Sequence, residues 1–196
     1  FAFSSCDNMT AIHIPASVSS IGTAIFADCN SLKEITVASA NAHYQAANGV
    51  IYSKDGTVLV TCPAAADVTI IDTVTEIAPY AFYYNANITS ITIPSGVTKL
   101  EEAAFGNCSK LASVNFKGNE LTTIGNHCFR SNSALSKIKL PASVTSIGAY
   151  AFAYCSNLDY IYFMGNAPTF GADIDGTYYD KVFISCTTNA YYPEGN

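Results

Sequence analysis

The sequence predicts a β-rich repeat solenoid of the α/β type, a right-handed superhelix of about seven repeats with a parallel sheet on its concave side. Two observations predict this fold. A motif recurs every 23 or 24 residues, apart from one gap of 56, and each copy is centred on a phenylalanine: Phe3, Phe26, Phe82, Phe105, Phe129 and Phe152. Each copy also contains one short segment of alternating apolar and polar residues. A fixed period of this length is the signature of a solenoid, in which each repeat buries its apolar face only against its neighbours.

One β-strand is expected in each repeat, close to the positions nine and eleven residues after the phenylalanine. These apolar positions enclose a polar one, as in Ile91-Thr92-Ile93 and Ile138-Lys139-Leu140, which is the period of a half-buried strand. Proline follows the strand at once in three repeats and ends it, because proline cannot donate to a sheet: Pro15, Pro94 and Pro141. Helix is expected only as single turns near the phenylalanines.

The gap of 56 residues predicts a degenerate repeat that carries an insertion. Leu59 stands 23 residues before the next phenylalanine, and Val68 and Ile70 then take the strand positions. Two β-prone runs flank Lys54-Asp55-Gly56, a sequence typical of a tight turn. We therefore expect a β-hairpin, within about residues 41–62, that projects from the solenoid.

Five of the seven cysteines follow the same period, three residues after the phenylalanine position: Cys6, Cys29, Cys62, Cys108 and Cys155. Asn85 and Asn132 occupy this place in two other repeats. Neighbouring strands lie within disulfide range, but side chains in such a column point inward in parallel, which favours free buried thiols. No Cys-x-x-Cys pair occurs, so we expect neither a metal site nor a cofactor.

Three segments resemble a known family. They are Ile-Pro-Ala-Ser-Val-Ser-Ser-Ile-Gly (14–22), Leu-Pro-Ala-Ser-Val-Thr-Ser-Ile-Gly (140–148) and Ala-Tyr-Ala-Phe-Ala-Tyr-Cys-Ser-Asn-Leu (149–158). They are similar to BspA-like leucine-rich repeats, found in surface proteins of bacteria and some protists. The resemblance covers about residues 1–165. It implies a leucine-rich-repeat solenoid and, because members have been linked to adhesion to host proteins and to other cells, a binding function. The chain departs from the best-known leucine-rich pattern, which has Asn or Cys where this chain has Ser17, Gly96 and Ser143.

The period also predicts the domain organisation. Residues 1–164 are expected to form the solenoid, and residues 165–196 leave the repeat and are interpreted as a C-terminal cap of the same domain, with one further strand. The first repeat has no such cap, so Phe3 and Met9 would be exposed unless another repeat or another molecule covers them. Because an open sheet edge is a template for pairing, end-to-end association through this repeat is an expected contact.

Charge and hydropathy argue against two classes of partner. Only 12% of the residues are charged and the net charge is −6, whereas nucleic-acid binding needs clustered Lys and Arg to neutralise phosphates. No run of 18 apolar residues occurs, which argues against membrane insertion. No signal peptide is visible, and because Phe1 lies inside a repeat, the chain is interpreted as a fragment or processed form of an extracellular or cell-surface protein.

The candidate binding residues occupy the solvent-facing positions of the expected strands. Along this face the side chains change from acidic, through small hydroxyl groups, to the lysines and tyrosines of the last two repeats. Tyrosine offers rigid amphipathic contact area and lysine offers charge, although Thr and Tyr also favour strands without any ligand. We expect the ligand site at Lys137, Lys139, Tyr160 and Tyr162, extended along the face by Asn115 and Thr92.

The function expected from these residues is an extracellular or cell-surface adhesion module without catalytic activity. Its ligand would be a protein or a glycan, including host extracellular molecules. An alternative is a structural spacer in a larger surface protein, which needs no ligand. A remote alternative is a carboxylate-based hydrolase that uses Glu34 and Asp67, expected on neighbouring strands about 5 Å apart. A water-exposed pair of like charges is the simpler interpretation of these two carboxylates.

Overall fold

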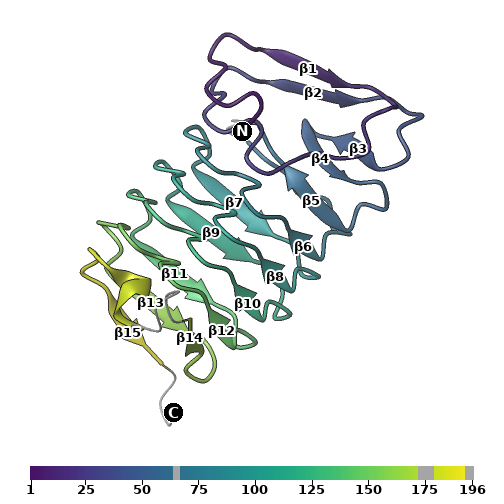
Figure 1. Cartoon of the computed structure of the whole chain (residues 1–196). Helices are drawn as coiled ribbons and strands as arrows, with labels where there is room; N and C mark the ends of the chain where they lie inside the picture. Colours follow the sequence, from purple (N-terminus) through teal and green to yellow (C-terminus); the bar gives the residue numbers. More distant parts are fainter. Residues whose placement is uncertain (64–66, 172–178, 193–196) are drawn as a thin grey trace.

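The protein forms an elongated stack of β-rich repeats (Figure 1). The computed structural model describes residues 1–63, 67–171 and 179–192, so the predicted cap at 165–196 is covered only in part. Within these residues the helical content is a single 3₁₀ turn, η1 (Tyr179–Phe183). The predicted solenoid of about seven repeats is therefore confirmed, and helix is limited to one short turn next to a phenylalanine.

One face of the stack, here called the strand face, carries the strands expected from the alternating pattern. They are β1 (Ala11–Ile14), β2 (Glu34–Val37), β7 (Ser90–Ile93), β9 (Ser113–Phe116), β11 (Lys137–Leu140), β13 (Tyr160–Phe163) and β15 (Asn189–Tyr191). The apolar residues of each strand point into the core, as Ile91 and Ile93 show. The strands pair in parallel but form three separate sheets, β1-β2, β7-β9 and β11-β13-β15.

The second face is one continuous sheet of eight strands. Its parallel part consists of two-residue strands, β6 (Glu76–Ile77), β8 (Lys99–Leu100), β10 (Thr123–Ile124), β12 (Ser146–Ile147) and β14 (Thr169–Phe170). Three strands of the insertion extend it, β5 (Val58–Thr61), β4 (Val50–Ser53) and β3 (Tyr44–Ala47). The two faces thus differ, because only the second one is hydrogen-bonded without interruption along repeats 3 to 7.

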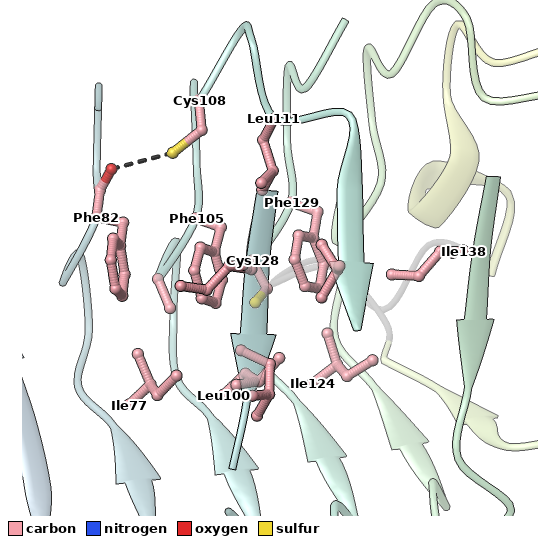
Figure 2. Packing of buried hydrophobic residues seen from close by; sticks show 14 of the residues in the cluster. Ile77, Phe82, Leu100, Phe105, Cys108, Leu111, Ile124, Cys128, Phe129 and Ile138 are labelled. Carbon is pink, nitrogen blue, oxygen red and sulfur yellow. Dashed lines mark hydrogen bonds between the residues drawn. The ribbon is translucent and has the colours of Figure 1, made fainter. Parts of the chain in front are cut away.

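The phenylalanines stack in a column between the two faces (Figure 2). Phe82, Phe105 and Phe129 are fully buried, and their rings lie parallel at centroid distances of 4.7 and 5.4 Å. The side chains of the second face, such as Ile77 and Leu100, form a parallel row in the same core. Each ring is therefore covered on both sides by the equivalent ring of a neighbouring repeat.

The backbone around each phenylalanine is irregular in a regular way. Positive φ angles recur two residues before and two residues after the phenylalanines, at Ser5, Ala24, Asp28, Tyr80, Tyr84, Ala103, Asn107, His127, Ser131, Tyr150, Tyr154 and Ser185. This conformation costs about 1–2 kcal/mol for a residue other than glycine and prevents a helix. Hydrogen bonds between repeats offset the cost: the Phe82 N–H donates to Ala104 O at 2.8 Å, and the Tyr84 N–H donates to Gly106 O at 3.0 Å.

The cysteine column is a hydrogen-bonded ladder. The Cys108 Sγ–H donates to the carbonyl oxygen of Phe82 at 3.1 Å, and Asn132 Nδ2 donates to that of Phe105 at 3.0 Å (Figure 2). The same bond is made by Cys29, Cys155 and Cys186. All seven cysteines are free thiols, as predicted, and burial raises the pKa values of Cys108 and Cys155 to about 12.

The alignment of repeat 3 expected from the period is wrong. Leu59 belongs to β5 and pairs with Ile77 of the second face, so it does not replace a phenylalanine. The Cys62 N–H instead donates to Ala81 O, a bond that the phenylalanine N–H makes in other repeats. Only three residues separate Leu59 from Cys62, whereas five separate Ile77 from Phe82, so a fixed step of 23 misaligns the repeat. Residues 67–70 also form no strand.

The inserted hairpin is present but does not project from the solenoid, as had been expected. Val50, Ile51 and Tyr52 of its central strand β4 are 0% exposed. A two-residue turn joins β3 to β4 at Asn48-Gly49, whose φ angles of 53° and 73° are those of a type I′ hairpin. The hairpin is buried because β4 separates two hydrophobic cores: Tyr52 packs into the large core of the later repeats, and Ile51 packs into a smaller N-terminal core.

Candidate ligand-binding face

The predicted Lys–Tyr cluster is assembled on two neighbouring strands of the strand face. β11 and β13 pair in parallel so that Lys137 lies beside Tyr160 and Lys139 lies beside Tyr162. The residues that alternate with them, among them Ile138, are buried, so the four side chains point outward. Lys139 Nζ lies 5.8 Å from the centroid of the Tyr162 ring, within the range of a cation–π contact.

A third tyrosine, missed in the sequence, completes this cluster. Tyr191 on β15 pairs with Tyr162, and their rings stack at 5.3 Å with an interplanar angle of 21°. The Tyr191 ring also lies 5.8 Å from that of Tyr160. Tyr160 and Tyr191 are 39% and 47% exposed, so the cluster offers aromatic surface to the solvent. The available signal was the spacing of Phe183 and Cys186, which repeats the three-residue step of the cysteine column and announces one further repeat.

A cleft of about 530 Å³ lies beside the lysines, between β9 and β11. The two strands are not hydrogen-bonded to each other, although β8 and β10 of the same repeats remain paired on the second face. The repeats are therefore splayed on one side only. The adjoining corner is longer than in neighbouring repeats: the step from Phe116 to Leu121 has five residues, whereas Ile93 to Val97 and Leu140 to Val144 have four.

The structure separates the six predicted site residues into three groups. Asn115, Lys137 and Lys139 line the cleft, together with Ser113, Phe116 and Met164, which the sequence did not single out. Tyr160 and Tyr162 lie on the next strand, beside the lysines. Thr92 is exposed on β7 and pairs with Asn115, so it lies one strand away from the cleft.

The two lysines of the cleft have no carboxylate partner in the described part of the chain. The ion pair found there joins Lys117 to Asp72 at 3.2 Å, and both side chains are exposed. Asn115 Nδ2 donates to Ser113 Oγ at 3.3 Å on the opposite wall of the cleft. The cleft thus presents two ammonium groups, an amide and a hydroxyl group above an apolar floor.

The carboxylate pair expected from the sequence is not formed as predicted. Glu34 lies exposed on β2, but Asp67 is not part of any strand, because repeat 3 has none on this face. In residues 1–63, 67–171 and 179–192, no three or more His, Cys, Asp or Glu side chains gather as metal ligands would. The same residues contain no helix long and apolar enough to cross a bilayer.

Known structures resemble the whole chain. A leucine-rich cell surface protein from Faecalibacterium prausnitzii superposes with a TM-score of 0.81 at 29% identity, over 95% of this chain and 48% of its own. A leucine-rich repeat protein from Eubacterium ventriosum gives a TM-score of 0.54 at 26% identity, over 95% of this chain and 61% of its own. The pneumococcal vaccine antigen PcpA shares the fold, with a TM-score of 0.73 at 23% identity, over 93% and 46% of the two chains.

The chain therefore spans about half the length of two of these proteins. No curated protein sequence matches it significantly. The model of the BspA type leucine-rich repeat region matches six copies, over residues 1–47 and 58–175. The match includes every phenylalanine of the period and all strands of the strand face up to β13. The chain belongs to the BspA-type leucine-rich repeat family.

Proposed function

We propose that this chain is a binding module of a bacterial cell-surface protein and that it engages a protein or glycan through the strand face. The family and the description of the Faecalibacterium protein as a cell surface protein support this location and a binding role. The observation that carries the proposal is the exposed cluster of Tyr160, Tyr162 and Tyr191 beside Lys139. Clustered tyrosines are frequent at the energetic centres of binding sites.

The cluster does not stabilise the repeats enough to explain its own presence. The buried residues of β11 and β13 already form the core side of these strands, so small polar residues on the outer side would leave that core unchanged. Exposed aromatic pairs add only about 0.5–1.5 kcal/mol each. A surface of partly exposed rings next to a cation is better accounted for by an external partner.

The test is binding to arrays of immobilised extracellular-matrix proteins and of glycans. The double variant Tyr160→Ala/Lys139→Ala is expected to lose at least about tenfold in affinity for any ligand found, because two residues of the contact surface are removed. Tyr84→Ala is the matched control, since Tyr84 is 42% exposed but lies at a phenylalanine turn, away from this face. Circular dichroism and thermal unfolding verify that each variant is folded.

Two outcomes would contradict the proposal. Unchanged binding by the double variant would place the ligand elsewhere on the molecule. Absence of any ligand on both arrays, with strand-face substitutions altering stability alone, would favour the structural spacer.

A further inference from the structure

The cleft between β9 and β11 has a chemistry more specific than that of the face around it. Lys137 and Lys139 are two residues apart on one strand, so their Cα atoms lie about 6–7 Å apart and both side chains leave the same side of the sheet. Neither lysine forms an ion pair within the residues that the structure describes. Two unpaired cations lining one cleft, in a protein of net charge −6, favour a ligand that carries a negative charge.

The remaining walls favour a sugar as the carrier of that charge. Ser113 and Asn115 offer a hydroxyl and an amide group, which suit the hydroxyl groups of a pyranose. Phe116 and Met164 supply apolar surface for its C–H groups, and the volume of about 530 Å³ is within the range of small-molecule sites. The exposed rings of Tyr160 and Tyr191 lie on the next strands, where further sugars of the same chain would extend.

We propose that the cleft binds an acidic glycan, with the carboxylate of a uronic or sialic acid residue held by Lys137 and Lys139. Asn115 and Ser113 then bind hydroxyl groups of the same residue, and the tyrosines contact its neighbours. This inference rests on the proposed function and narrows it to one ligand class. An acidic peptide would also satisfy the lysines, but it would not need a cleft with a mixed polar and apolar lining.

The experiment measures binding of defined oligosaccharides by isothermal titration calorimetry. Tetragalacturonic acid and 3′-sialyllactose are the acidic probes, their neutral counterparts are the methyl ester of tetragalacturonic acid and lactose, and hexaglutamate is the peptide probe. At least one acidic sugar is expected to bind, and its neutral counterpart is expected to bind at least about tenfold more weakly. A preference for one acidic probe identifies the source of the carboxylate.

Three variants locate the site. Lys137→Gln is expected to weaken binding of the acidic sugar at least about tenfold, because it removes one cation without changing the size of the side chain greatly. Lys110→Gln is the matched control, since Lys110 is exposed outside the cleft, and it should bind as the wild type does. Asn115→Trp fills the cleft from an outward-facing position and should abolish binding without removing a charge.

The outcomes distinguish this inference from the broader proposal. Equal binding of acidic and neutral sugars, or binding of hexaglutamate alone, would overturn the acidic-glycan site. Failure of every probe would overturn it as well. A ligand that depends on Tyr160 but is insensitive to Lys137→Gln and Asn115→Trp would leave the proposed function standing and remove only the cleft.

Discussion

The first two repeats and the later repeats have the same sequence period but different packing. From Phe82 to Phe183 five phenylalanine rings stack in one column, with neighbouring centroids 4.7 to 5.7 Å apart. In the N-terminal part only Phe3 and Phe26 stack, at 5.9 Å, and Phe3 is exposed. The difference shows that a repeat contributes fully only when neighbours cover both of its sides.

The inserted hairpin is the physical boundary between the two parts. Side chains alternate along β4, so Val50 and Tyr52 enter the large core while Ile51 enters the N-terminal core. Beyond this strand, one direct bond between repeats 2 and 4 joins Asn87 Nδ2 to Asn30 O at 3.3 Å. The insertion thus replaces the missing strand of repeat 3 as the wall against which both cores pack.

The largest expected effect is the removal of a ring from the continuous column. Phe105→Ala should lower the free energy of unfolding by about 3–5 kcal/mol, because Phe105 is fully buried between two stacked rings. Phe26→Ala should cost less, since Phe26 stacks on one partly exposed ring. Urea unfolding followed by circular dichroism measures both. Equal losses would show that the two parts share one cooperative core.

The second expected effect tests the boundary strand itself. Ile51→Ala should destabilise the N-terminal core by about 2–4 kcal/mol and leave β7 to β13 largely unaffected. The adjacent Val50→Ala is the matched variant, because Val50 packs into the large core. Hydrogen exchange measured by mass spectrometry should therefore rise in residues 11–37 for Ile51→Ala, but within β7 and β9 for Val50→Ala. The same exchange pattern in both variants would contradict two separate cores.

The parts of the fold that the sequence predicted are those in which every repeat has the same length. The alternation around Ile91 and Ile93 places the strand, and the burial of both residues confirms it. Repeat 3 failed because β5 pairs with both β4 and β6, and these contacts shift Leu59 away from the position that counting assigns to it. Pairing between distant strands outweighs local periodicity at such an insertion.

The candidate site was predicted in composition but not in shape. Lys137, Lys139, Tyr160 and Tyr162 were expected to lie together because strands of equal repeats pair in register, and they do. The cleft depends on the absence of pairing between β9 and β11, which no local pattern encodes. Tyr191 was missed because its strand has three residues, too few for an alternating pattern to be recognised.

The third effect concerns the ladder that joins the repeats. Asn132→Ala should cost about 1–3 kcal/mol, because it leaves the buried carbonyl oxygen of Phe105 without its donor. Asn132→Cys should recover most of this loss, since a cysteine makes the same bond in four other repeats, and it also removes the buried Asn132 Oδ1, which has no partner. Thermal unfolding of the two variants provides the measurement. A cysteine variant no more stable than the alanine variant would refute the equivalence of the two side chains.

The smallest effect is expected at the exposed turn that aligns the boundary strand. Hydrogen bonds from the Ser53 hydroxyl group and from the Thr57 N–H and hydroxyl groups lower the pKa of Asp55 to about 2. Because the pKa in the folded state is depressed, the ionised carboxylate stabilises the fold above its unfolded pKa of about 3.9, and this stabilisation is lost as the pH falls through about 2. Asp55→Asn should therefore melt slightly below the wild type at pH 7, and the difference in Tm should shrink between pH 4 and pH 2. Since solvent screens this turn, the shift should be smaller than that of any core variant. A Tm difference that persists unchanged at pH 2 would assign the role of Asp55 to the shape of the turn, so that the boundary would depend on backbone geometry instead of charge.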